Sequence, residues 1–126
     1  MANYYSSART NYFRVKDTGA FMSWVKEFEV NYGVEVASKK DSFALLFDSD
    51  CGIPPFRDQI DFIDELATHL ADNEVAVFLE CGAEKLRYIF GCAVAVNNKL
   101  ERRTINFDSI YEMAKDLGSN ITEAQY

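Results

Sequence analysis

The sequence has few of the residues that carry the commonest protein chemistries. Its 126 residues include one histidine, three cysteines and two prolines. A single histidine excludes multi-histidine metal sites. The cysteines, Cys51, Cys81 and Cys92, form no CxxC pair of the kind that indicates a zinc site or a disulfide framework, so we expect reduced thiols. Neither GxGxxG nor GxxxxGK[ST] occurs, so no phosphate-cradling loop is indicated.

Long apolar segments are also missing. No apolar run reaches the roughly 18 residues that a membrane helix needs, and the opening MANYYSSART lacks the apolar core of a secretory signal. We therefore expect a cytoplasmic protein. With 48% hydrophobic and 14% aromatic residues, the chain can bury one core. We expect one domain over residues 1–126, with an N-terminal arm at 1–10 and a C-terminal tail at 119–126.

What the sequence does have is negative charge gathered in its middle third. The net charge is −7, and residues 1–47 and 85–126 each carry +1. Residues 48–84 contain ten acidic residues and one base, Arg57, which gives this segment a net charge of −9. Such a field repels nucleic acid and attracts basic surfaces, so direct binding of DNA or RNA through this segment is not expected.

The hydrophobic pattern predicts an alternation of strands and helices. Strands are expected at 12–15, 34–36, 43–47, 75–80, 86–96 and 101–107, with a bulge at Gly91. A first helix begins at a cap at Asp17 or Thr18 and ends before Gly33, a second lies between Pro55 and Asn73, and a third begins near residue 109. The third should have a core face formed by Ile110, Met113, Ala114 and Leu117. This order predicts an α+β domain, with a mostly antiparallel sheet of about five to six strands and three helices packed mainly on one face.

The second expected helix carries an unusual row of carboxylates. Positions 58, 61, 65, 68 and 72 fall on one side of it, and four of these five are acidic. Like charges at this spacing repel by about a few tenths of a kcal/mol per pair, and no base within the row relieves them. The row indicates a solubilising face, a surface that meets a basic groove on a partner, or a metal-binding surface. We call Asp58, Asp61, Glu65 and Asp72 the acidic row, and add Asp48 and Asp50 as partner-binding candidates.

Two other segments are weighed as sites. FDSDCG at 47–52 could hold Mg²⁺ through Asp48 and Asp50 after a strand, but a calcium loop starting at Asp48 would have Gly52 and Gln59 where oxygen ligands are needed. His69 is expected to be an exposed, structurally neutral side chain. The arm offers Tyr4, Tyr5 and Arg9, residue types that anchor interfaces, either on a partner or on its own sheet. We expect no catalytic residue and no cofactor.

Several segments resemble those of small acidic proteins carried by phages, plasmids and integrative elements. They are NYFRVKD at 11–17, HLADNEVAVF at 69–78, GAEKLRY at 82–88 and NITEAQY at 120–126. The resemblance covers most of the chain, assigns no role to a residue, and implies an antagonist of bacterial host defence, of the anti-CRISPR or antirestriction type. A protein of this kind binds a target in the cytoplasm of a bacterial host and has no catalytic activity.

Three functional hypotheses follow. The first is a stoichiometric inhibitor whose acidic surface occupies the basic, nucleic-acid-binding groove of a bacterial defence complex. The second is an immunity or antitoxin protein that neutralises a basic nuclease toxin. The third is a small metal-dependent phosphohydrolase that uses Asp48 and Asp50. Because a sheet edge without a cover can pair with itself, a homodimer is a further expectation.

Overall fold

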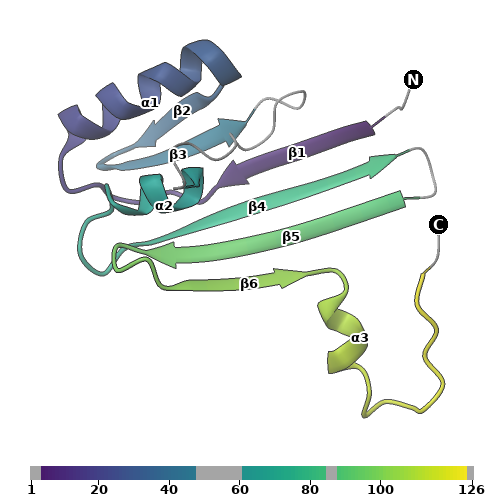
Figure 1. Ribbon diagram of the computed structural model, residues 1–126. Helices are drawn as coiled ribbons and strands as arrows, with labels where there is room; N and C mark the ends of the chain where they lie inside the picture. Colours follow the sequence, from purple (N-terminus) through teal and green to yellow (C-terminus); the bar gives the residue numbers. More distant parts are fainter. Residues whose placement is uncertain (1–3, 48–60, 85–87, 125–126) are drawn as a thin grey trace.

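The computed structural model describes residues 4–47, 61–84 and 88–124, which form a six-stranded antiparallel sheet and three helices in one domain (Figure 1). The expected α+β class is confirmed. The strands lie across the sheet in the order β2-β3-β1-β4-β5-β6. In chain order the elements are β1 (Tyr4–Thr10), α1 (Thr18–Tyr32), β2 (Glu35–Lys39), β3 (Ser42–Phe47), α2 (Phe62–Ala67), β4 (Val75–Glu84), β5 (Tyr88–Asn97), β6 (Arg102–Asn106) and α3 (Ser109–Met113).

The first helix and the hairpin after it are as the sequence predicts. The Asp17 carboxylate accepts a hydrogen bond from the Ala20 amide at 3.0 Å, which satisfies one of the free donors at the start of α1. Gly33 ends the helix in a left-handed conformation with φ of 70°, which glycine adopts without steric cost. Lys40 and Asp41 then form the tight turn between β2 and β3.

Residues 4–10 of the N-terminal arm expected at 1–10 belong to the molecule's own sheet, which is one of the two placements expected for the arm. Residues 4–10 form β1, which lies inside the sheet between β3 and β4. The segment YYSSART lacks the apolar side chains that predict an interior strand. The reason is that the core side of β1 carries small residues such as Ala8 and Thr10, both buried. The strand expected at 12–15 is not one: only isolated bridges form there, from Phe13 to Phe43 and from Val15 to Leu70.

Two polar side chains fasten the end of β1 to its neighbours. The buried Thr10 hydroxyl accepts from the Leu45 amide at 2.9 Å and donates to the Asn11 carbonyl at 2.8 Å. The Asn11 side chain accepts from the Val77 amide at 2.8 Å and donates to the Val75 carbonyl at 3.1 Å. These contacts pair backbone groups of β3 and β4 where the chain leaves the regular ladder.

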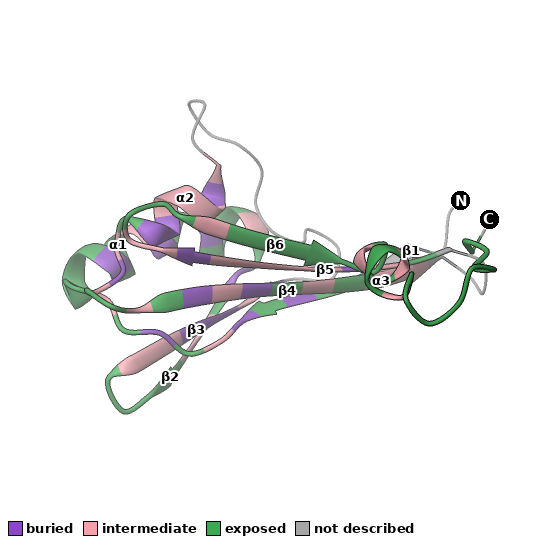
Figure 2. Ribbon diagram, turned by 90° about the horizontal axis from the view of Figure 1, so that it is seen from below, coloured by how far each residue is buried: buried purple, intermediate pink, exposed green. Residues whose placement is uncertain are grey.

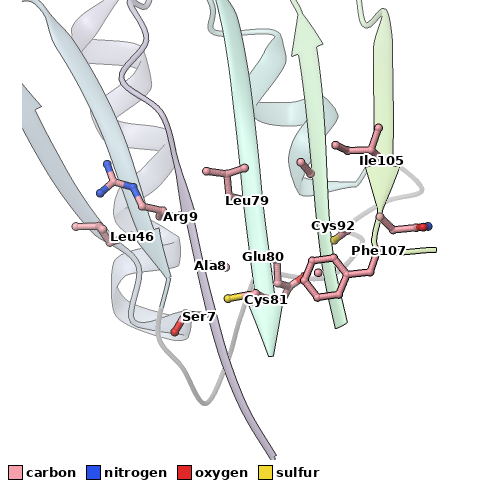
Figure 3. Close-up of a pocket in the computed structure, with 13 residues that line it drawn as sticks. Ser7, Ala8, Arg9, Leu46, Leu79, Glu80, Cys81, Cys92, Ile105 and Phe107 are labelled. Atoms are coloured by element: carbon pink, nitrogen blue, oxygen red, sulfur yellow. The ribbon is translucent and has the colours of Figure 1, made fainter. Parts of the chain in front are cut away.

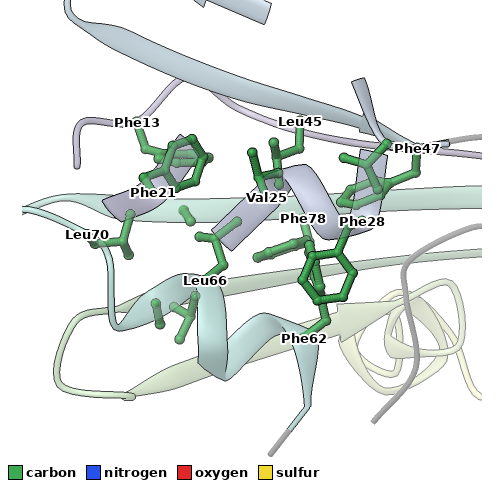
Figure 4. Packing of buried hydrophobic residues seen from close by; sticks show 14 of the residues in the cluster. Phe13, Phe21, Val25, Phe28, Leu45, Phe47, Phe62, Leu66, Leu70 and Phe78 are labelled. Carbon is green, nitrogen blue, oxygen red and sulfur yellow. The ribbon is translucent and has the colours of Figure 1, made fainter. Parts of the chain in front are cut away.

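The hydrophobic core lies on one face of the sheet, under α1 and α2 (Figure 4). Aromatic rings fill much of it, and the Phe28 and Phe62 rings of the two helices meet edge to face at 4.9 Å. Figure 2 shows both helices on the same side of the sheet, and none of the described helices lies across the other side. We call that other side the open face. The largest fully buried core side chains are Phe13, Phe21, Phe62, Phe78, Leu45, Leu66 and Leu70.

The second helix is much shorter than the sequence predicts. It covers Phe62–Ala67 instead of extending to Asn73, and residues 48–60 lie outside the described part of the chain. The helix stops because the backbone after it pairs with the segment before α1. Lys16 donates from its amide to the His69 carbonyl at 3.0 Å, and Ala71 donates from its amide to the Arg14 carbonyl at 3.1 Å. Tertiary pairing overrides helical periodicity here.

Two expectations for the C-terminal third are wrong. Helix α3 forms, but none of its residues is buried, so the predicted core face does not pack on the core. Gly91 is not in a bulge, because β4 and β5 pair one residue to one from Val75↔Asn97 to Glu84↔Tyr88. Residues 118–124 have no helix or strand. Among the described residues, no helix is both long enough and apolar enough to cross a membrane.

Candidate functional site

The acidic row does not form the unrelieved stripe that the sequence predicts. Asp61 is the N-cap of α2, and its carboxylate accepts from the Asp64 amide at 2.8 Å. Arg102 of β6 reaches across from the sheet and places its Nη2 atom 3.0 Å from Asp61 Oδ1 and 2.7 Å from Asp64 Oδ1. Both carboxylates therefore share one base that is distant in sequence, which offsets one of their two negative charges within the molecule.

The electrostatics at this pair fit a structural role. Partial burial raises the pKa of the Asp61 carboxyl, but hydrogen bonds from Arg102 and from the Asp64 backbone outweigh it and hold the pKa below its ordinary value. The ionised form is therefore favoured in the folded protein. The pair joins the start of α2 to the edge strand β6.

The remaining described members of the row point to different partners. Glu65 Oε1 accepts from the Trp24 indole at 3.1 Å, which ties α2 to α1. Asp72 lies beyond α2, and its carboxylate accepts from the Asn98 side chain at 2.9 Å. Each described member of the row thus has a polar partner within the molecule.

Several other predicted sites have plain outcomes. Asp48, Asp50 and Asp58 lie outside the described residues. Within the described residues, no group of three or more His, Cys, Asp or Glu side chains is placed to hold a metal ion. Cys81 and Cys92 are free thiols, whereas Cys51 lies outside the described part.

His69 is not the exposed side chain expected from sequence. Its ring packs against Trp24 at a centroid distance of 5.0 Å and against Phe21 at 6.0 Å. Burial lowers the pKa of His69, and the nearby Lys16 charge lowers it further. These contacts give the histidine a packing role between α1 and the segment after α2.

The N-terminal candidates are strand residues. The backbones of Tyr4 and Tyr5 pair with Glu84 and Ala83 of β4. Arg9 is exposed on the open face, and its guanidinium lies 6.0 Å from the ring centre of Tyr12. Of the three, Arg9 belongs to the candidate site described next.

The open face carries a band of mostly apolar side chains across the sheet. Strand register aligns Leu46 with Arg9, Arg9 with Leu79, Leu79 with Ala93, and Ala93 with Ile105. Figure 3 shows Leu46, Arg9, Leu79 and Ile105 side by side on four strands. Ile105 is 63% exposed and Leu79 is 47% exposed, so water reaches the middle of this apolar band.

A groove of about 540 Å³ follows this band. Leu79, Cys81, Gly91 and Ala93 belong to its floor strands, and Ile105 and Phe107 come from the β6 side (Figure 3). We call these six residues the groove. Its size lies in the range of binding sites for small apolar ligands or for a few side chains of a partner.

Gly91 has a packing role in the groove. A Cβ atom at position 91 would lie 2.5 Å from the Phe107 ring, so only glycine allows the ring to rest on β5 in this way. The Phe107 amide donates a hydrogen bond to the Gly91 carbonyl at 3.0 Å, which holds the backbone of Phe107 beside β5. Phe107 is still 53% exposed, so the ring forms part of the accessible surface.

The apolar surface continues from the groove to α3. A second hollow, of about 610 Å³, shares Gly91, Ile105 and Phe107 with the groove and reaches Ile110 and Met113 of α3. Exposed contiguous apolar surface of this kind marks interaction sites in soluble proteins.

One sequence signal could have identified this face. In β4, Val75, Val77 and Leu79 alternate with Ala76 and Phe78, so both faces of the strand are apolar. An antiparallel strand with one solvated face ordinarily alternates apolar with polar residues. The run therefore indicates burial on two faces, and the described chain covers only one.

The chain matches no protein-family model, no curated protein and no solved structure.

Proposed function

We propose that this protein acts by binding another protein, without catalysis, and that the open face is its interface. The observation that supports this most is the two-sided apolar character of β4 and β5 in a sheet that has helices on one side. Leu79 and Ile105 would be unfavourable on a surface that always faces water, whereas on an interface they supply binding free energy.

The acidic row is a weaker candidate for the interface than the open face. Asp61 and Asp64 already contact Arg102, and Glu65 already contacts Trp24. Using these carboxylates to bind a basic partner would leave the Arg102 guanidinium and the Trp24 indole of this chain without their present partners. The net charge of −7 acts at longer range than these contacts, because it steers the approach of the protein to a basic surface.

Within the binding class, we propose a stoichiometric inhibitor of a bacterial defence complex in the cytoplasm of the host cell. The support is the resemblance to small acidic proteins of phages, plasmids and integrative elements, together with the net charge. The target would be a basic protein or nucleoprotein complex, with no direct contact to nucleic acid or membrane.

The alternatives make different predictions. An immunity or antitoxin protein would bind a basic nuclease toxin encoded beside it. A phosphohydrolase using Asp48 and Asp50 would show Mg²⁺-dependent turnover of phosphoesters that disappears in an Asp48→Asn variant.

Capture from a bacterial host lysate tests the proposal. The bait is the full chain, compared with a Leu79→Asp/Ile105→Asp variant of the open face. Val30→Asp is the matched control, because Val30 is an exposed apolar residue on α1, away from that face. We expect wild type and the control to recover one basic complex and the open-face variant to lose it, with all three showing the same circular dichroism. Equal recovery by all three would reject the open face as the interface.

A further inference from the structure

We infer that the open face binds a second copy of this chain, with α3 of each copy seated in the groove of the other. This inference rests on the proposed function, because it uses the same surface, and a second copy and a host complex would compete for that surface. The sequence predicted a homodimer through a sheet edge that was not specified, and this inference assigns the contact to α3 and the groove.

The first support is that α3 presents apolar side chains that the described part of the chain leaves largely exposed. Met113 is 72% exposed and Leu117, in the turn after the helix, is 86% exposed. Ile110 lies one turn before Met113, so these two side chains share one side of the helix. A helix of five residues is too short to be stable by itself in water, and its stability must come from packing its apolar side.

The second support is the position of α3. It follows β6 at the edge of the sheet and projects beyond that edge, away from α1 and α2 (Figure 1). A helix that projects in this way is available to another molecule. The groove has the complementary property, since it is an accessible apolar hollow of about 540 Å³ with no described helix over it. Apolar helix side chains inserted into an apolar groove form a common mode of protein recognition.

The third support is charge. Arg9 lines the groove, and Arg103 lies on β6 two residues before Ile105; neither arginine forms an ion pair with a carboxylate of the described chain. The segment that would enter carries Asp108, Glu112 and Asp116, and its one base, Lys115, lies 2.7 Å from Glu112. The acidic segment around α3 thus meets a groove that has Arg9 in its lining, although the whole protein is acidic and two copies would otherwise repel.

The fourth support is symmetry. Each copy has one groove and one α3, so a twofold axis that seats one helix also seats the other. Reciprocal exchange fills both surfaces and closes at two copies. A one-way contact would leave one groove and one helix uncovered at the ends of a chain of copies.

Sedimentation equilibrium of the full chain tests this inference. We expect wild type and Val30→Asp to be dimers. Leu79→Asp in the groove and Met113→Asp in α3 should each raise the dimer dissociation constant by about 100-fold or more, as expected for central apolar anchors. Because Met113 is exposed and Leu79 is half exposed, both variants should keep the fold of the single copy, and their unfolding midpoints in urea should match that of wild type diluted below its dimer dissociation constant.

A mixing experiment identifies the contact. In a mixed dimer of Leu79→Asp and Met113→Asp, one groove and one helix are intact and face each other, whereas both defects fall on the second contact. The mixed dimer should therefore be tighter than either variant alone. Packing of groove against groove predicts no effect of Met113→Asp and no advantage for the mixture, and that result would overturn the inference.

The outcomes separate this inference from the proposed function. A wild-type monomer at every concentration, together with lysate capture that depends on Leu79 and Ile105, would overturn the second copy as partner and leave the open face as the interface for a different protein. A monomer whose lysate partners are unaffected by Leu79→Asp/Ile105→Asp would overturn both.

Discussion

Replacing Arg102 tests whether Asp61 and Asp64 of the middle acidic segment are paired within the molecule. In the Arg102→Ala variant, Asp61 and Asp64 lose a guanidinium that lies 3.0 and 2.7 Å from their nearest oxygens. The matched control is Arg103→Ala on the same strand, since the Arg103 side chain donates only to the Arg102 carbonyl. The two variants remove the same charge from neighbouring positions.

The expected difference follows from geometry and exposure. Hydrogen bonds to charged groups contribute about 1.5–3 kcal/mol when shielded, and exposed ion pairs about 0.2–1 kcal/mol. The Arg102 and Asp61 side chains are 32% and 26% exposed, which is between these limits. We expect Arg102→Ala to lower the free energy of unfolding in urea by about 2 kcal/mol, and Arg103→Ala to change it by about 0.5 kcal/mol or less.

The same difference should depend on pH. Because the pKa of Asp61 is lowered in the folded protein, its ionised carboxylate stabilises the fold above the ordinary aspartate pKa, and that stability is lost as the pH falls through the folded pKa. The gap between wild type and Arg102→Ala should therefore be full at neutral pH and shrink in acid. Equal unfolding free energies for the two arginine variants at neutral pH would refute the internal pair.

Three further predictions concern packing and protonation. Gly91→Ala should lower the free energy of unfolding in urea by about 1 kcal/mol, because the added Cβ atom meets the Phe107 ring. In a Phe107→Ala background the same substitution should raise that free energy by about 0.5–1 kcal/mol. If Gly91→Ala had the same effect in both backgrounds, the contact between Cβ and the ring would be contradicted. Asn11→Ala should lower the free energy of unfolding in urea by about 2 kcal/mol, because two backbone groups of β4 lose their hydrogen bonds to the Asn11 side chain. A change near zero would show that these hydrogen bonds do not stabilise the fold. The pKa of His69, measured by NMR, should lie below the ordinary value of about 6.5. Because the folded state then binds fewer protons than the unfolded state, the free energy of unfolding should fall as the pH drops from the ordinary pKa toward the lower folded pKa. An ordinary pKa would contradict the packing of the ring.

Local signals predicted the elements whose formation depends on local chemistry. Asp17 and Gly33 bound α1 because capping and left-handed geometry are properties of a few adjacent residues. The hairpin before residue 47 and the turn at Asn97 follow in the same way, since the Asn97 side chain accepts from the amides of Lys99 and Glu101.

The errors arose where distant segments meet. The polar segment Tyr4–Thr10 became an interior strand because β3 and β4 pair with it. The second helix stopped at Ala67 because the next residues pair with the chain before α1. The acidic row was predicted from a projection of that longer helix, and a projection does not show a base from β6.

The candidate site was missed because the apolar residues of β4 and β5 were counted as one core. Alternation shows which residues share a face, but whether a second layer covers that face depends on where the helices pack. The third helix was expected to supply part of the core, and it projects from the sheet edge instead.

The accessibility of Cys81 tests the central claim, that the open face is a covered interface when the protein functions. Cys81 is exposed in the groove, so a protein with Cys51 and Cys92 replaced by serine carries one thiol reporter there. The measurement is the rate of maleimide modification of Cys81, in dilute solution, at high protein concentration and in a bacterial host lysate. We predict fast modification when dilute and strong protection at high concentration or in the lysate. Equal rates under all three conditions would show that nothing covers the groove and would contradict the account.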